Sequence, residues 1–265
     1  MLRTVTSHLS MQVHAPAELV LAVTVAEGAH DVDELLRVTR DGAPADVVEV
    51  KGPHGTRLHR VDSGPGLVEV DYRATVTGRD AAPEVTDADL IEYLRPSRYA
   101  DSDRLLAFAG DQFRGLRGHE LLAGVVDWVH GHLVYLSGSS QPTDGATDTL
   151  LKRRGVCRDF AHLVVALLRA RDLPARLAAV YAPGLSPMDF HAVVEAYVDG
   201  AWHVVDATRL APRQSLLRIA TGRDATDTAF LSTYRGEVTF QELTVTATVD
   251  GVLPLDDGTR PATLG

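Results

Sequence analysis

Cysteine is the scarcest functional residue of this 265-residue chain, which contains only Cys157. A single cysteine excludes an internal disulfide, and this suits a reducing compartment. Any thiol chemistry of the chain therefore has to use Cys157.

Basic clusters and long apolar runs are also missing. The formal net charge is −10, from 26 basic and 36 acidic residues, and no Lys/Arg stripe is present. We therefore expect no nucleic-acid partner. No apolar run approaches the roughly 20 residues of a membrane-spanning helix, and the first residues lack the order of a secretory signal. We expect a cytoplasmic protein with no membrane partner.

The first part of the chain, residues 1–80, carries mostly β signals. Residues 67–77 alternate between apolar and polar side chains, and turn residues at 41–42 and 63–66 separate the strand patterns. These features predict an N-terminal antiparallel β-sandwich-like domain. The spacing of four histidines in this part matches no metal-binding motif, so we expect no metal site there; they are His14, His30, His54 and His59.

The character changes near residue 85, after a linker at 79–86. Helical patterns at 101–113 and 120–133 follow, and strand patterns return later in the chain. We predict an α+β catalytic core over residues 86–250 and a C-terminal tail at 251–265, loose from Pro254 onward.

Cys157 stands at the start of an apolar run. Residues 160–168 are strongly apolar over a helical length, and Pro174 ends the pattern. The unpaired N–H groups and the positive dipole end of a helix favour a thiolate there. A structural cysteine would more often lie in the middle of such a helix, but the position alone does not decide between a nucleophile and a structural cysteine.

A predicted β-hairpin supplies possible partners for this thiol. Asp199-Gly200 separates apolar strands and signals a two-residue turn. Pairing Val198 with Ala201 puts His191 and Asp206 on one face as diagonal neighbours, within side-chain reach. A bulge would change this register. Alone, His191 would more often be a partly buried polar residue and Asp206 a turn cap; together with Cys157 they predict a Cys-His-Asp triad.

Several segments in order resemble the transglutaminase-like superfamily, especially its bacterial branch of cysteine-protease-like members. The resemblance covers about residues 90–230. The segments are Gly155-Val156-Cys157-Arg158-Asp159-Phe160-Ala161-His162, Leu173-Pro174-Ala175-Arg176, Met188-Asp189-Phe190-His191-Ala192, Asp199-Gly200-Ala201-Trp202, Val205-Asp206-Ala207-Thr208 and Gly222-Arg223-Asp224-Ala225, with Ser97-Arg98-Tyr99 and Tyr135 upstream.

The resemblance implies a papain-like core of helices packed on an antiparallel sheet, and an N-terminal β module that resembles the one preceding this core in the same branch. It implies Cys157 as nucleophile, His191 as general base and acid, and Asp206 as the orienting residue. Two positions depart from the family pattern: Val193 replaces a frequent tryptophan, and Ala207 replaces the usual proline.

Other polar residues near these motifs are weaker candidates for contacting substrate. They are Tyr135, Asp159, Asp189 and Arg223. Asp159 could instead form a local ion pair with Arg158, and Arg223 a structural pair with Asp224. His162 is expected in the core. The backbone N–H of Cys157 is the best candidate for an oxyanion donor.

The combined prediction is a cysteine-dependent hydrolase that acts on an amide or peptide bond through a thioester acyl-enzyme, without a cofactor. Its expected partner is a peptide or other amide-containing substrate. Two alternatives stay open. One is an acyltransferase, which forms an amide as a transglutaminase does or carries out acyl transfer or cyclisation in a biosynthetic pathway; the other is a non-catalytic binding module on the same fold.

Overall fold

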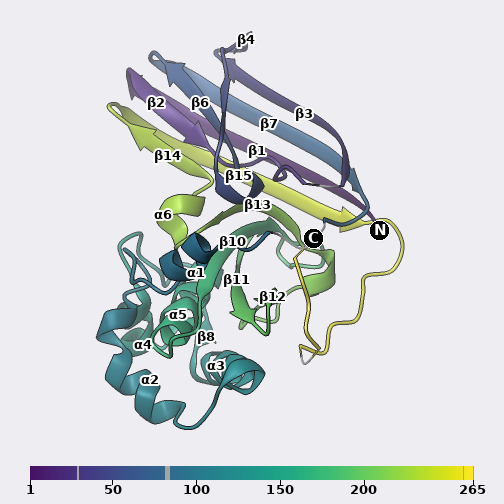
Figure 1. Cartoon of the computed structure of the whole chain (residues 1–265). Coiled ribbons are helices and arrows are strands. Elements are labelled where there is room, and N and C mark those ends of the chain that lie inside the picture. Colours follow the sequence, from purple (N-terminus) through teal and green to yellow (C-terminus); the bar gives the residue numbers. More distant parts are fainter. Residues whose placement is uncertain (29, 81–83, 259, 265) are drawn as a thin grey trace.

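The computed structural model describes residues 1–28, 30–80, 84–258 and 260–264. A β-sandwich lies above a third antiparallel sheet, and most helices gather below that sheet (Figure 1). The predicted α+β class, with a strand-rich N-terminal part, is confirmed.

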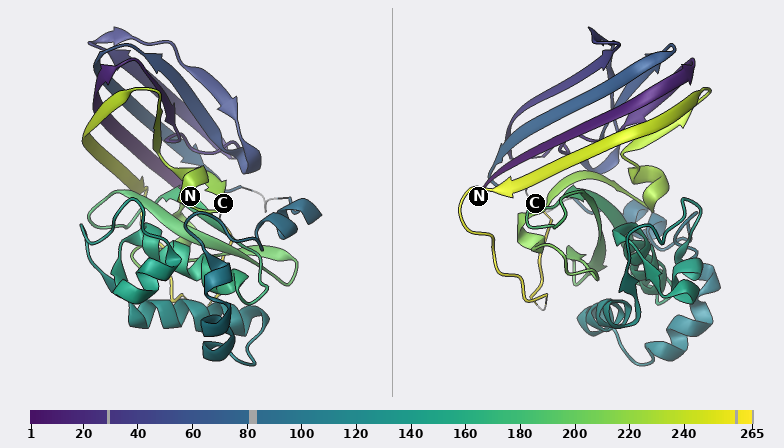
Figure 2. Two further views of the ribbon diagram at one scale, coloured as in Figure 1. Left: turned by 90° about the vertical axis from the view of Figure 1, so that its left-hand side faces the viewer. Right: turned by 180° about the vertical axis from the view of Figure 1, so that it is seen from behind.

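The sandwich consists of two antiparallel sheets, seen from two further sides in Figure 2. One sheet has the strand order β15 (Glu237–Val249), β1 (Leu2–Ala15), β7 (Gly66–Thr77), β3 (Asp31–Arg40) and β4 (Ala43–Pro44). The other has the order β14 (Leu231–Tyr234), β2 (Ala17–Leu21), β6 (Arg57–Ser63) and β5 (Val48–Lys51). Alternate residues of β7 (Val68, Val70 and Tyr72) are buried, because successive side chains of a strand point to opposite faces.

Two strands of the sandwich come from the far end of the chain. β15 pairs with β1 from Arg3↔Val249 to Ala15↔Glu237, and β14 pairs with β2. The domain limits of 1–80, 86–250 and 251–265 remain a prediction, but the pairing gives residues 231–249 to the sandwich sheets.

The third sheet carries the functional strands. Its order is β12 (Ala201–Val205), β11 (Phe190–Val198), β10 (Ala175–Tyr181) and β13 (Leu217–Gly222). A short parallel pair joins β8 (Val134–Tyr135) to β9 (Arg154–Gly155). The α-helices are α1 (Asp87–Glu92), α2 (Leu106–Gln112), α3 (Gly118–His132), α4 (Ala146–Lys152), α5 (Cys157–Arg169) and α6 (Ala225–Thr228), and the 3₁₀ turns are η1 (Pro53–Gly55), η2 (Ser102–Arg104) and η3 (Arg213–Ser215).

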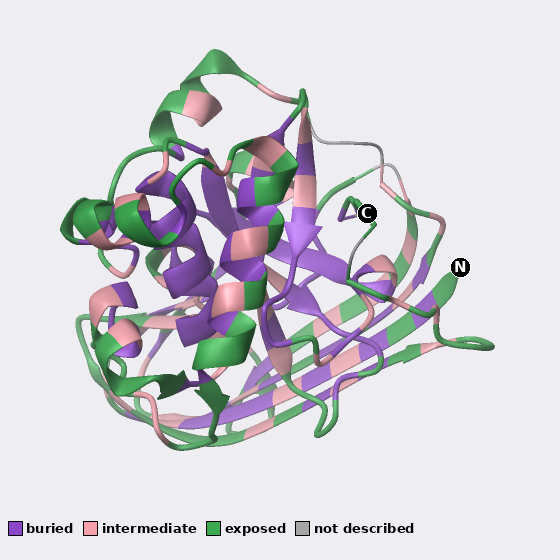
Figure 3. Ribbon diagram, turned by 90° about the horizontal axis from the view of Figure 1, so that it is seen from below, coloured by how far each residue is buried: buried purple, intermediate pink, exposed green. Residues whose placement is uncertain are grey.

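Helix α5 forms the centre of the lower layer. Its apolar run packs against β10 and β11, and Leu163, Val165 and Leu167 have no exposed surface. Figure 3 shows buried residues concentrated in the middle of this layer, with exposed residues on the outer helices. No helix in the described ranges has the length and apolarity that a membrane crossing requires; α3, the longest, has 15 residues.

The opposite face of the third sheet is covered by the sandwich and by the C-terminal segment. Tyr181 and Leu217 share one hydrophobic cluster with sandwich residues. The segment after Pro254, predicted to be loose, instead lies against β12: the Val204 N–H donates to the Ala262 carbonyl at 2.8 Å. Apolar side chains hold it there, since Leu264 is 2% exposed.

Candidate active site

Cys157 is the first residue of α5, as the sequence predicts. The carboxylate of Asp159 caps this helix start by accepting the Val156 N–H at 2.8 Å, and its other oxygen accepts the Ser140 hydroxyl at 2.9 Å. Asp159 is 1% exposed, so its oxygens serve the helix start and the loop around Ser140. The Arg158 guanidinium lies 3.4 Å from Oδ1, the oxygen that accepts the Ser140 hydroxyl, and this is the local ion pair expected as the alternative to substrate contact.

The hairpin has the register that the sequence predicts. Val198 pairs with Ala201, and the ladder continues to Val194↔Val205. Asp206 follows β12 directly, and its Oδ2 lies 2.8 Å from His191 Nε2 on β11. Both side chains are almost fully buried.

Thr208 completes the hydrogen bonding of Asp206. Its N–H and its hydroxyl both donate to Asp206 Oδ1, at 2.8 and 2.7 Å. Sequence reasoning did not assign Thr208 a role, although a hydroxyl two residues after an aspartate is a recurrent local partner of that carboxylate. The carboxylate is therefore oriented from both sides.

The charges of the site reinforce one another. Burial lowers the pKa of His191, but the Asp206 carboxylate and the Cys157 thiol outweigh it and raise that pKa to about 10. Burial raises the pKa of Asp206, but His191 and the Thr208 donors outweigh it, so the pKa is lowered. The other ring nitrogen of His191, Nδ1, has no nitrogen or oxygen hydrogen-bond partner among the described residues. The Cys157 thiol acts on the same imidazole ring and raises its pKa. This arrangement favours the imidazolium form of His191.

A cavity of about 600 Å³ opens between the third sheet and the sandwich, and Cys157 and His191 line it. Much of its wall is apolar and comes from both layers, including Ile219 on β13 and Leu243 on β15. The nucleophile candidate is therefore accessible, and the sandwich forms part of the cavity wall.

Of the remaining candidates, Tyr135 and Asp189 lie near the candidate triad. Burial, followed by the nearby Cys157 thiol, raises the pKa of Tyr135 to about 12, although the Cys157 backbone near its hydroxyl acts in the opposite direction. Asp189 lines the cavity and accepts the Phe190 N–H at 2.7 Å, and burial raises the pKa of its carboxyl.

Arg223 does not line this cavity. Its guanidinium pairs with Asp227 at 2.8 Å and with Glu92 at 3.7 Å. The structure thus gives Arg223 a structural ion pair, but with Asp227 rather than with the predicted Asp224. His162 is buried, as expected, and accepts the Ala225 N–H at 3.1 Å.

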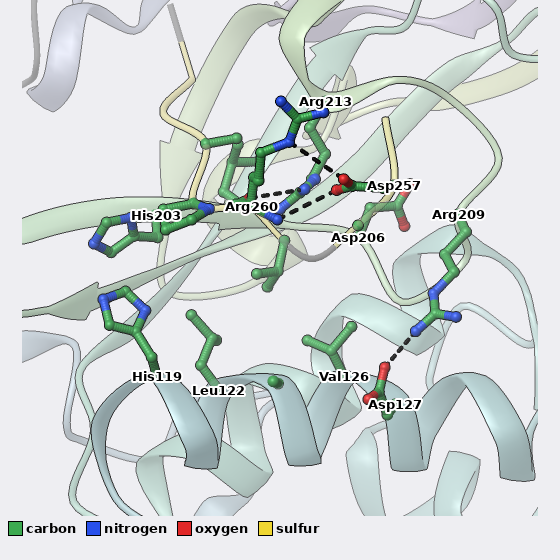
Figure 4. Close-up of a pocket in the computed structure, with 16 residues that line it drawn as sticks. His119, Leu122, Val126, Asp127, His203, Asp206, Arg209, Arg213, Asp257 and Arg260 are labelled. Carbon is green, nitrogen blue, oxygen red and sulfur yellow. Dashed lines mark hydrogen bonds and ion pairs between the residues drawn. The ribbon is translucent and has the colours of Figure 1, made fainter. Parts of the chain in front are cut away.

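A second cavity of about 610 Å³ reaches Asp206 from the side of α3 (Figure 4). Arg209 pairs there with Asp127 on α3, and Arg260 pairs with Asp257 at 3.2 Å. Neither Cys157 nor His191 lines this cavity, so we assign it no part in the chemistry. Among the described residues, no group of three or more His, Cys, Asp or Glu is arranged to hold a metal ion.

Comparison with known proteins agrees with this geometry. Residues 117–207 match the family model of the transglutaminase-like superfamily. The crystal structure of a candidate cysteine protease from Cytophaga hutchinsonii is similar over 97% of this chain and 94% of that one, with a TM-score of 0.89 and 33% identity. The chain belongs to the transglutaminase-like superfamily.

This transglutaminase-like chain also resembles mycobacterial proteins that are described as uncharacterized. It is 28% identical over 206 residues to one from Mycobacterium leprae, which is 71% of each chain. It is 36% identical over 93 residues to one from Mycobacterium tuberculosis, covering 35% of this chain and 25% of that relative.

The two departures from the family pattern fall near the candidate triad residues His191 and Asp206. Val193 is buried in the cluster that includes Leu264 of the C-terminal segment. The carbonyl of Ala207 accepts a hydrogen bond from His130 Nδ1 at 2.9 Å. Both substitutions therefore leave the His191–Asp206 contact intact.

Proposed function

We propose that this transglutaminase-like protein is a cysteine-dependent hydrolase that cleaves an amide or peptide bond with Cys157, His191 and Asp206. One observation carries the proposal: the buried His191–Asp206 pair, at 2.8 Å, shares a cavity wall with a cysteine at a helix start. A helix start and an imidazolium both favour the nucleophilic thiolate.

In the first half-reaction, the Cys157 thiolate attacks the substrate carbonyl carbon and forms a C–S bond. The C–N bond then breaks, and the imidazolium of His191 gives its proton to the departing amine. The products are a thioester on Cys157, a free amine and a neutral imidazole. Asp206 keeps the ring oriented throughout, because its second oxygen is fixed by Thr208.

In the second half-reaction, His191 takes a proton from water, and the resulting hydroxide attacks the thioester carbonyl. The C–S bond breaks, the acid leaves, and the thiolate–imidazolium pair is restored. The backbone N–H of Cys157 is the proposed oxyanion donor, and the Tyr135 hydroxyl, near the same backbone, is the proposed second donor.

The two alternatives differ in outcome rather than in fold. Attack of an amine on the same thioester would make the protein an acyltransferase. A binding module would form no thioester at all, and a Cys157→Ala variant would behave as the wild type does. We favour hydrolysis, because water needs no separate amine site.

The test combines thiol labelling with turnover. We expect iodoacetamide at about pH 6 to modify Cys157 faster than a free thiol, whose pKa is about 8.5, and His191→Ala to abolish the difference. Mass spectrometry of the protein mixed with a panel of peptide p-nitroanilides should detect a Cys157 acyl adduct, and added amines should show whether amide products form. Labelling at the free-thiol rate, with no adduct, would overturn the proposal.

A further inference from the structure

Strand β14 lies at the edge of its sheet. Within the part of the chain that the structure describes, it pairs with β2 and no strand lies on its outer side. The Ala22 N–H donates to the Phe230 carbonyl at 3.0 Å, so Ala22 and Phe230 form a hydrogen-bonded pair at the start of the β2–β14 ladder. Because bonded and non-bonded pairs alternate in antiparallel strands, the N–H and C=O groups of Leu231 and Thr233 point away from β2.

This free edge belongs to the same cavity as the nucleophile. Leu231, Ser232 and Tyr234 of β14 line the cavity together with Cys157 and His191. In Figure 1, β14 lies at the margin of the sandwich, directly after α6. An edge with unpaired backbone groups is a ready template for a further strand.

Aromatic rings connect the edge strand to the triad. The ring of Phe230, the residue before β14, stacks on Phe190 with centroids 5.4 Å apart. Phe190 immediately precedes His191 on β11. The contact between Phe230 and Phe190 therefore joins the start of β14 directly to β11, the strand that carries His191.

The cavity next to this edge suits an apolar side chain. Leu177 and Ala179 on β10, Ile219 on β13 and Leu243 on β15 contribute to its wall. In strand addition, backbone hydrogen bonds supply affinity, and pockets for alternate side chains supply specificity. The structure offers both features beside Cys157.

We propose that the substrate is an extended peptide whose acyl-side residues add to β14 as a further strand, with a large apolar side chain in the cavity. This inference rests on the proposed hydrolase function. Contacts to the acyl side persist in the thioester, so one strand pairing would hold the substrate through both half-reactions. Backbone pairing would use the outward groups of Leu231 and Thr233.

The test uses acetylated peptide chloromethyl ketones, in which the Cys157 thiolate displaces chloride as the C–S bond forms. A leucine-containing tetrapeptide reagent should label Cys157 about tenfold faster than its single-residue analogue. It should also label about tenfold faster than the same tetrapeptide with N-methylated backbone amides. Each of these two comparison reagents lacks one or two of the backbone hydrogen bonds to β14. Thr233→Pro should remove most of this advantage, because proline deletes an outward N–H that the β2 ladder does not use.

Thr233→Val is the matched control, because it keeps the N–H and should label as the wild type does. Iodoacetamide rates should be equal in all three proteins. Equal labelling rates for the long, short and N-methylated reagents would overturn the strand-addition proposal. This comparison uses the wild-type protein alone, so it still decides the question if Thr233→Pro does not fold. Failure of the hydrolase proposal looks different: iodoacetamide itself would then react at the free-thiol rate.

Discussion

Replacing Asp206 with asparagine tests the electrostatics of the site most directly. The substitution keeps the shape but removes the charge that, after the opposing effect of burial, most raises the pKa of His191. That pKa should fall from about 10 toward or below its ordinary value of 6.5, because burial is then opposed only by Cys157. The imidazole should then be largely neutral at pH 7, and the proposed Cys157 thiolate should lose its countercharge.

The size of the effect follows from the contacts that are lost. A charge-assisted hydrogen bond contributes roughly 1.5–3 kcal/mol to the free energy of unfolding, and Asp206→Asn should lose about that amount. For turnover, we expect kcat/KM to fall roughly 10²–10⁴-fold, because both imidazole orientation and imidazolium stabilisation suffer.

The assay is the rate of iodoacetamide labelling of Cys157 as a function of pH, followed by mass spectrometry. At about pH 6 the wild type should react much faster than Asp206→Asn, and the two should converge near pH 9, where ordinary thiols ionise. Asp199→Asn, at the exposed turn of the same hairpin, makes the same charge change away from the ring and should match the wild type. Equal wild-type and Asp206→Asn rates at about pH 6 would refute the reasoning.

Three further predictions concern the support of the site. Thr208→Val removes the 2.7 Å hydroxyl bond to Asp206 but keeps the N–H bond, so kcat/KM should fall roughly three- to tenfold and stability by about 1 kcal/mol. The folded-state pKa of His191 is raised from 6.5 to about 10, so protonated His191 stabilises the folded protein fully below pH 6.5 and this stabilisation is lost as pH rises toward 10. Urea titrations across that range should show the free energy of unfolding declining in the wild type and declining less in Asp206→Asn. Glu195→Gln leaves Arg176 and Arg218 without their buried carboxylate, at 2.9 and 2.7 Å, so the urea midpoint should shift by the equivalent of roughly 3–5 kcal/mol, and an unchanged midpoint would contradict this.

The features of the site that depend on neighbouring residues in the sequence could be predicted. The start of α5 at Cys157 follows from the apolar run behind it, and the register of the hairpin follows from the Asp199-Gly200 turn. Each of these features is determined within about 15 residues of chain by periodicity and turn chemistry. The relation between His191 and Asp206 could therefore be predicted before any coordinates.

The pairings between segments far apart in the sequence could not be predicted. β3 (Asp31–Arg40) is rich in charged residues, and its strand state depends on pairing with β7. The pattern of residues 238–249 predicts a strand but not its neighbour, and β15 pairs with β1 at the other end of the chain. The docked C-terminal segment includes Asp256, which pairs with Arg213, 43 positions away in the sequence. Periodicity carries no information about such partners.

These non-local contacts make the sandwich part of the candidate site. The buried Arg3 of β1 donates to the Leu216 carbonyl at 3.1 Å, and the hydroxyls of Tyr181 on β10 and Ser7 on β1 form a hydrogen bond at 3.0 Å. Such buried bonds are costly to leave unmade, so they fix the sandwich against the third sheet. With that position fixed, Leu243 and the free edge of β14 become walls of the cavity that contains Cys157. The N-terminal strands β1 and β2 therefore hold in place the two strands that contribute these walls, although every residue of the proposed triad lies outside the sandwich.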